Sequence, residues 1–299
     1  MSDSTRTPAH ELKAMAELTL LGAIWGGSFL LMRVAAPEFG PFALVEIRLV
    51  FGALVLLPFV YRARRRLAGR WHMLFAIGMI NSAVPFTLFA WATAIAPAGI
   101  SAIANSVTAL FAVLFAGMMF GERIGIRRGF GLASGIIGVV VMIGMPMAGV
   151  PVGWAALAAT TAAACYGLAG NLVKRYLAGL PPVALGGATL SCSAVVLSPM
   201  AVWHWPEQTL SAAVWASAVT LGVLCTGVAY ALLFRLLEKI GPSGTATVTY
   251  LVPLFGVAWA WLVLAEPITS GMLIAGALIL GGVALSQSRR PPPVITRQA

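Results

Sequence analysis

The sequence predicts an all-α membrane protein in which ten transmembrane helices form two inverted five-helix repeats around a central cavity. Three observations predict this fold class: the composition, the spacing of the apolar runs and an internal repeat. Of the 299 residues, 60% are hydrophobic and only 9% are charged, whereas soluble domains carry about 25% charged residues. The few charged residues stand in short clusters between apolar runs, which is typical of a polytopic membrane protein.

Ten apolar runs are long enough to cross the hydrocarbon core, which needs roughly 20 residues of α-helix. The predicted helices cover residues 15–34, 42–61, 71–93, 99–119, 129–145, 152–173, 183–203, 212–234, 244–264 and 270–286. The loops between them are short and leave no room for a separate soluble domain. The first run is too long for a signal peptide and lacks a convincing cleavage site, so we expect it to be retained as a helix.

The positions of the positive charges support the number of predicted helices, independently of hydropathy. Of the 19 Lys and Arg residues, all except Arg33 and Arg48 fall on one side of a ten-helix arrangement. Cationic loops resist translocation, so this side is predicted to be cytoplasmic and to carry both termini. The net charge of +10 is spread over many short loops instead of one face or tail, which argues against nucleic acid as a partner.

An internal repeat relates the two halves of the chain. The stretch PFALVEIRLVFGALVLLP at 41–58 returns as PVALGGATLSCSAVVLSP at 182–199, with eight identities in an ungapped alignment. The same offset of 141 residues pairs Arg33 with Lys174. Matching prolines in order are hard to obtain by chance between two apolar helices, so the sequence predicts a duplication.

A second pair of segments supports the duplication. Residues 97–124 match 242–268 with one residue dropped, and this match pairs Glu122 with Glu266. Because five is an odd number of helices, the second copy enters the bilayer from the opposite side, as in the inverted repeats of secondary transporters. We therefore predict repeats at 15–145 and 152–286, with cytoplasmic tails at 1–14 and 287–299.

The chain also resembles a known family. The motif AIWGGSF in the first predicted helix, GERI and AEPI after the fourth and ninth, and the glycine-rich fifth and tenth helices resemble the drug/metabolite transporter superfamily, in particular its EamA-type members, over residues 15–286. Among them the chain looks most like the YddG-type exporters of aromatic and other neutral amino acids. The resemblance implies a cavity between the halves, lined by helices 1, 3, 4, 6, 8 and 9, with helices 5 and 10 at the rear.

Polar side chains in the middle of these helices are the candidates for substrate binding, because such groups rarely face lipid. They are Trp25, Ser28, Asn81, Ser82, Asn105, Thr108, Tyr166, Asn171, Tyr230, Thr249 and Tyr250. For each one the alternative is a hydrogen bond between helices. Pro85 and Pro253 interrupt the backbone ladder within a span, so each is a hinge candidate or a static kink.

Glu46 lies inside the second predicted helix and has two interpretations. It forms an ion pair with Arg33 across the first hairpin, or it is a proton site that couples transport to a gradient. Arg48 is only two residues away and points roughly to the opposite side of the helix, so it cannot pair with Glu46 directly. The second repeat has Gly187 and Thr189 at these two positions, which argues against a symmetric coupling role.

Motifs of other function classes are missing from the sequence. It has no HExxH motif, no nucleophile elbow, no buried carboxylate pair and no phosphate-binding glycine loop, so we predict neither an enzyme nor a direct user of ATP. Three cysteines (Cys165, Cys192 and Cys225) lie in apolar runs without metal-ligand spacing, so no metal or other cofactor is predicted.

The predicted function is export of small amphipathic metabolites across the bacterial inner membrane by a secondary transporter with alternating access. The resemblance implies neutral or aromatic amino acids as the substrates, and the small number of buried charges disfavours multiply charged solutes. A drug or nucleoside exporter of the same fold, or a passive facilitator or channel, is the alternative. The expected partners are the solute, the lipid bilayer and protons. No prediction of the oligomeric state follows from the sequence.

Overall fold

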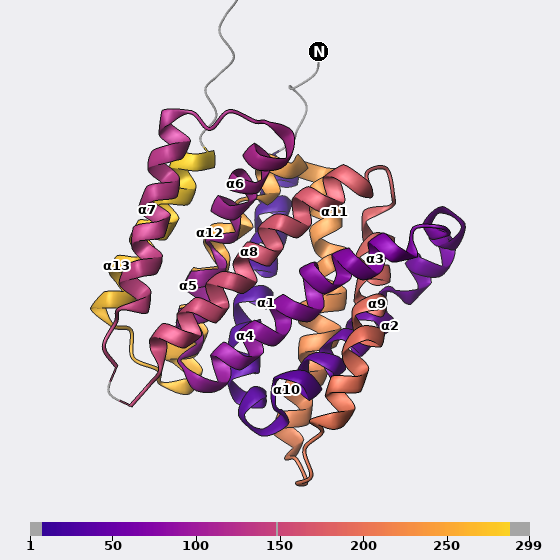
Figure 1. The fold of residues 1–299 in the computed structure, drawn as a ribbon, viewed down its shortest axis with the longest axis horizontal. Coiled ribbons are helices and arrows are strands. Elements are labelled where there is room, and N and C mark those ends of the chain that lie inside the picture. The colour runs from indigo at the N-terminus through magenta and orange to yellow at the C-terminus, as the bar shows by residue number, and fades with distance from the viewer. Residues whose placement is uncertain (1–7, 148, 288–299) are drawn as a thin grey trace, which may run out of the picture.

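The computed structural model describes residues 8–147 and 149–287, and this part of the chain contains helices and connecting turns but no strand (Figure 1). The helices are α1 (Pro8–Phe39), α2 (Pro41–Leu67), α3 (Trp71–Gly78), η1 (Met79–Ala83), α4 (Val84–Ile95), α5 (Ala98–Asn105), α6 (Thr108–Phe120), α7 (Ile126–Ile143), α8 (Val152–Tyr176), α9 (Pro182–Trp203), α10 (Ala212–Gly222), η2 (Val223–Val228), α11 (Ala229–Thr245), α12 (Val248–Leu264) and α13 (Ser270–Gln287). Residues 8–14 of the predicted amino-terminal tail are helical, while residues 1–7 and 288–299 of the two predicted tails lie outside the described residues.

These helices join into the ten predicted spans. Nine segments are long and apolar enough to cross a membrane, and α12 is a shorter apolar helix of 17 residues. The third span is α3, η1 and α4, the fourth is α5 and α6, and the eighth is α10, η2 and α11. A sharp turn at Gly241, whose φ of 72° suits glycine, separates the eighth span from the ninth within the segment labelled α11. The prediction of ten helices is therefore confirmed.

The two halves pack with a two-fold relation. The first span, α1, packs against α12 and α10–α11, and its counterpart α8 packs against α6 and α4. The remaining pairs, α2 with α9 and α7 with α13, join corresponding helices of the two halves. A Cβ added to Gly26 would lie 2.7 Å from the backbone nitrogen of Gly256, and one added to Gly167 would lie 2.8 Å from that of Ala112. Each half therefore contains the same close approach between two helix backbones.

Helices α7 and α13 lie side by side at one edge of the molecule (Figure 1). Their backbones touch at glycines: a Cβ added to Gly131 would lie 2.5 Å from the carbonyl oxygen of Gly282, and one added to Gly282 would lie 2.4 Å from that of Gly131. Small residues at such crossings permit the van der Waals packing that holds helices together in lipid. This packing agrees with the position at the rear of the molecule that the resemblance implies for the fifth and tenth helices.

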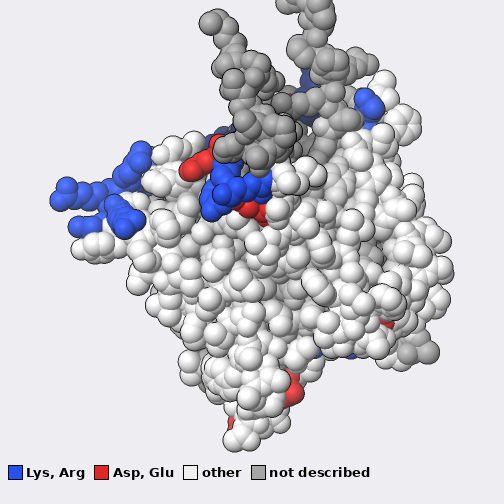
Figure 2. Space-filling view, turned by 180° about the vertical axis from the view of Figure 1, so that it is seen from behind, with Lys and Arg blue, Asp and Glu red and all other residues white. Residues whose placement is uncertain are grey.

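Lys and Arg side chains gather at one end of the molecule and on the hairpin between α2 and α3, while the sides below them are mostly uncharged (Figure 2). We call this the basic end; its described charged segments are 62–70, 123–128, 174–175 and 235–239. Helix α1 starts at this end, where Glu17 binds Arg235 and Lys239. Its counterpart α8 instead finishes there with Lys174. The corresponding helices therefore run in opposite directions.

Candidate functional site

A cavity of about 390 Å³ lies between the two halves. Side chains from every span except α7 and α13 line it, and a volume of this size is within the range of small-molecule sites. Its walls are largely aromatic and aliphatic, with residues such as Phe86, Phe89 and Phe234. This arrangement provides an apolar chamber with a few polar groups, which suits a solute with one polar and one apolar part.

Eight of the eleven predicted site residues line this cavity: Trp25, Ser28, Asn81, Asn105, Thr108, Tyr166, Tyr230 and Thr249. The other three do not line it. Ser82 is fully buried and accepts a hydrogen bond from Asn81 at 3.4 Å. Asn171 donates to the carbonyl oxygens of Ala112 at 3.0 Å and Gly167 at 2.9 Å, and therefore joins α8 to α6. The hydroxyl of Tyr250 donates to Gln287 at 3.4 Å.

Two irregular helical turns lie next to the cavity lining, and no pattern in the sequence predicts them: one contains the cavity residue Asn81, and the other contains Thr226, which binds Arg48. The third and eighth spans each contain a π-helical turn, η1 and η2, at corresponding places; such turns are frequent at functional sites. Each one follows a glycine in close contact with the opposite half. A Cβ on Gly78 would lie 2.7 Å from the Thr189 carbonyl oxygen, and one on Gly222 would lie 3.0 Å from that of Arg48.

The two hinge candidates adjoin cavity-lining residues. Pro85 is the second residue of α4, which follows η1, and Pro253 lies inside α12. In a regular helix a proline leaves the carbonyl four residues earlier without its partner. Those carbonyls belong to Asn81 and Thr249, and both residues line the cavity. Both prolines are buried, and their role as hinges remains a prediction.

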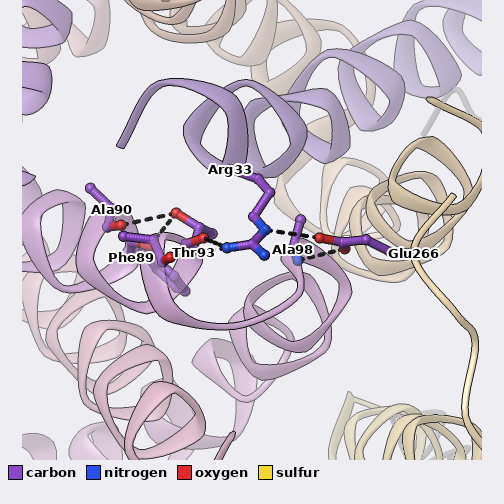
Figure 3. Close-up of polar contacts among 7 residues, drawn as sticks. Arg33, Phe89, Ala90, Thr93, Ala98 and Glu266 are labelled. Atoms are coloured by element: carbon purple, nitrogen blue, oxygen red, sulfur yellow. Dashed lines mark hydrogen bonds and ion pairs between the residues drawn. The ribbon is translucent and has the colours of Figure 1, made fainter. Parts of the chain in front are cut away.

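Arg33 does not bind Glu46, so the expected ion pair across the first hairpin is wrong. Arg33 Nε instead donates to Glu266 Oε1 at 3.0 Å, and Nη1 donates to the carbonyl oxygens of Thr93 at 2.9 Å and Ala94 at 3.0 Å (Figure 3). The second carboxylate oxygen of Glu266 accepts from the Ala98 backbone nitrogen at 2.8 Å. We call these five residues the Arg33 clamp; they tie α1, α4, α5 and the end of α12 together at the end opposite the basic end.

The backbone beside Glu266 is strained. Ala265 has a φ of 54° and is the one residue other than glycine with positive φ among the described residues. The left-handed conformation costs a residue with a Cβ roughly 1–2 kcal/mol. At the corresponding place in the first half, Gly121 adopts a φ of 67° before Glu122. The strain at Ala265 is offset by the contacts of the clamp, which hold Glu266 in place.

Lys174 and Glu122 occupy the positions that correspond to Arg33 and Glu266, at the basic end. Their contact is looser: Lys174 Nζ lies 3.6 Å from Glu122 Oε1, and 65% of the lysine side chain is exposed. The cavity lining has the same asymmetry. Met32, next to Arg33, is 1% exposed, whereas its counterpart Val173 is only half-buried. The two ends of the cavity are therefore held unequally, with shorter and less exposed contacts at the Arg33 clamp than at the Lys174–Glu122 pair.

Arg48 is a cavity residue that the candidate set did not include. Its side chain is buried, its Nε donates to Thr226 Oγ1 at 2.9 Å, and its guanidinium carbon lies 3.7 Å from the centre of the Phe86 ring. The signal was present in the sequence, because a basic residue inside an apolar span marks a functional position by default. Glu46 does not line the cavity, and its Oε2 is buried without a hydrogen-bond partner among the described residues. Its coupling role remains a prediction.

The chain matches the EamA-like transporter family over residues 14–144 and 153–287. A probable amino-acid metabolite efflux pump of Escherichia coli (strain K12) is 25% identical over 279 residues, covering 89% of this chain and 92% of that protein. A probable terminal-alkyne amino-acid exporter of Streptantibioticus cattleyicolor is 26% identical over 283 residues, covering 93% and 94%.

The match with a solved crystal structure covers 92% of this chain and 96% of the other chain, with a TM-score of 0.62 and 20% sequence identity. This likeness shows a shared fold. The family match covers well over half of the sequence and both sets of five spans. The chain therefore belongs to the EamA-like transporter family and is a multi-pass membrane transporter.

Proposed function

We propose that this transporter exports small amphipathic metabolites, with neutral and aromatic amino acids as its substrates. The observation that carries the proposal is the aromatic-lined cavity between the two halves, in which a few polar groups face apolar walls. Aromatic rings such as Trp25 and Phe89 provide a surface for an apolar side chain, and the amides of Asn81 and Asn105 provide polar contacts. The two relatives named for amino-acid export support the same substrate class.

Alternating access is the mechanism that the asymmetry of the cavity supports. The positive-inside rule places the basic end in the cytoplasm of a bacterial cell, and the looser contacts at that end favour an inward-facing state. Solute enters from the cytoplasm, and rocking of the halves opens the Arg33 clamp while the Lys174–Glu122 contact tightens. Two similar halves in opposite orientation give two states of similar energy, as such a cycle requires.

Counterflow in liposomes tests the proposal. Purified protein is reconstituted into vesicles loaded with one unlabelled neutral amino acid, and uptake of the same labelled amino acid is followed. We expect saturable uptake that overshoots equilibrium, because a carrier exchanges bound solute across its two states. Uptake that never saturates and never overshoots would show a channel, and no uptake of any neutral amino acid would reject the substrate class.

Glu46 is the candidate for coupling to protons, since its buried carboxyl oxygen lacks a hydrogen-bond partner among the described residues. We expect Glu46→Gln to abolish the stimulation of amino-acid flux by a pH gradient while counterflow without a gradient continues. Glu38→Gln is the matched control, because Glu38 is an exposed glutamate near the end of α1. Equal stimulation in Glu46→Gln and wild type would remove Glu46 from the coupling mechanism.

A further inference from the structure

Arg48 is the one cationic side chain that lines the cavity among the described residues. It is 6% exposed, and within the described part of the chain no carboxylate forms an ion pair with it. A buried charge without a counter-ion is costly, so such groups pair, coordinate ligands or face a solvated cavity. We propose that Arg48 binds the carboxylate of the transported solute, which deepens the proposed function and rests on it.

The guanidinium is held in a fixed plane but keeps donors free. Arginine has five N–H donors in a rigid fork. Nε donates to Thr226 Oγ1 at 2.9 Å, and Nη1 lies 3.6 Å from the sulfur of Met32. Nη2 has no hydrogen-bond partner among the described residues, so its two donors are available to a ligand. The hydroxyl of Thr226 in turn donates to the Leu221 carbonyl oxygen at 2.8 Å, so its oxygen is oriented to accept from Arg48.

Phe86 supports the other side of this arrangement. Its ring centre lies 3.7 Å from the guanidinium carbon, a stacking distance at which the ring attracts the cation. Phe86 itself lines the cavity and lies in α4, while Thr226 lies in η2 and Arg48 in α2. Three spans therefore fix the fork before any solute arrives, and a preorganised fork loses little entropy when it binds a planar carboxylate in bidentate fashion.

Arg33 shows what an arginine that finds its partners within the chain looks like in this protein. Its Nε and Nη1 bind a carboxylate and two backbone carbonyls, and it lies at the end of the molecule rather than in the cavity lining. Within the described part of the chain, Arg48 binds neither a carboxylate nor a backbone carbonyl. The contrast indicates that the anionic partner of Arg48 comes from outside the chain.

The repeat limits this site to a single negative charge. Thr189 stands at the position that corresponds to Arg48 in the second half, and its hydroxyl is bound to the carbonyl oxygens of Leu185 and Gly186. Among the described residues the cavity therefore has one cationic anchor, which matches one carboxylate. A solute with a monocarboxylate and an apolar part fits both the anchor and the aromatic walls, while a solute without an acidic group leaves Arg48 unpaired.

Competition between an amino acid and its amide tests the anchor. L-Phenylalanine and L-phenylalaninamide are compared as competitors of labelled amino-acid counterflow in the reconstituted wild type, Arg48→Gln and Arg48→Lys. We expect the amide to compete about tenfold to hundredfold more weakly than the acid in the wild type, because it lacks the charged partner of the guanidinium. In Arg48→Gln the two competitors should become nearly equal, and Arg48→Lys should retain part of the preference.

The decisive readout is the ratio of the concentrations at which the acid and the amide inhibit counterflow by half. A purely structural role of Arg48 would lower the flux without changing this ratio. Equal competition by acid and amide in the wild type, or an unchanged ratio in Arg48→Gln, would overturn the anchor. If Arg48→Gln does not fold, the same ratio in Arg48→Lys decides. If the wild type transports no neutral amino acid, thermal stabilisation of purified protein by small monocarboxylates but not by their amides still tests Arg48. A failure of the proposed substrate class can therefore be distinguished from a failure of the proposed role of Arg48.

Discussion

Replacing Glu266 with glutamine should expose the cavity to the end opposite the basic end. The carboxylate binds both Arg33 and the Ala98 backbone, and glutamine retains hydrogen bonding but loses the charge. The side chains of Arg33 and Glu266 are 31% and 13% exposed, so solvent screens their ion pair. We expect the substitution to remove about 1–2 kcal/mol of interaction free energy from the state in which the clamp is closed. A free-energy change of that size shifts a two-state equilibrium roughly fivefold to thirtyfold toward the state in which the clamp is open.

Modification of an introduced cysteine measures this shift. Ser28→Cys places a thiol in the cavity lining, in a chain whose own three cysteines are replaced by alanine. A thiol reagent that does not cross membranes is added from the side opposite the basic end, and we expect Glu266→Gln to raise the rate of modification by the same factor.

The matched control for the clamp is Glu122→Gln, which weakens the corresponding contact at the basic end. That contact is longer, at 3.6 Å, and more exposed, so its removal should leave the modification rate unchanged or lower. Equal rates in wild type and Glu266→Gln would show that the clamp does not seal the cavity.

Gly282→Ala should destabilise the protein by about 1–3 kcal/mol, which is typical of overpacking. The added Cβ would lie 2.4 Å from the Gly131 carbonyl oxygen and 3.0 Å from the Gly135 nitrogen. Both are backbone atoms, so relief requires the two helices to separate and to lose their contacts along the rear of the molecule. The midpoint of thermal unfolding in detergent measures the effect.

Gly281→Ala is the control one residue away. No atom lies within 4 Å of a Cβ added at Gly281, and the change of glycine to alanine in the helix is the same. We expect no loss of stability, or a slight gain, because alanine has the higher helix propensity. Similar midpoints for the two variants would contradict the proposed close contact between α7 and α13.

The sequence predicted the ten helices and the cavity position of most candidates because both depend on local patterns. Apolar length and charge clusters set the spans, and mid-span polarity selected residues such as Asn81 and Tyr230. Asn171 shows the precision of such reasoning: Gly170, its neighbour, lines the cavity, while Asn171 joins two helices. A pattern along one helix identifies its polar face only to within about one residue.

The sequence did not predict the partners of the arginines, because these depend on packing between distant segments. One of the two interpretations of Glu46 pairs it with the nearby Arg33, yet the partner of Arg33 is Glu266, 233 positions away. The repeat contained the relevant clue, since it aligned Glu266 with Glu122 and Arg33 with Lys174. The π-helical turns η1 and η2 were missed for a similar reason: each forms where a glycine meets the backbone of the opposite half, which no single helix reveals.

The difference between Arg33 and Lys174 has a kinetic consequence for an empty carrier. A guanidinium joins one carboxylate and two carbonyls at one gate, while an ammonium at the other holds a single distant carboxylate. Under the proposed orientation, the ground state of the unloaded protein faces the cell interior. Such a carrier spends most of its time ready to load, so it captures solute efficiently even when the internal concentration is low.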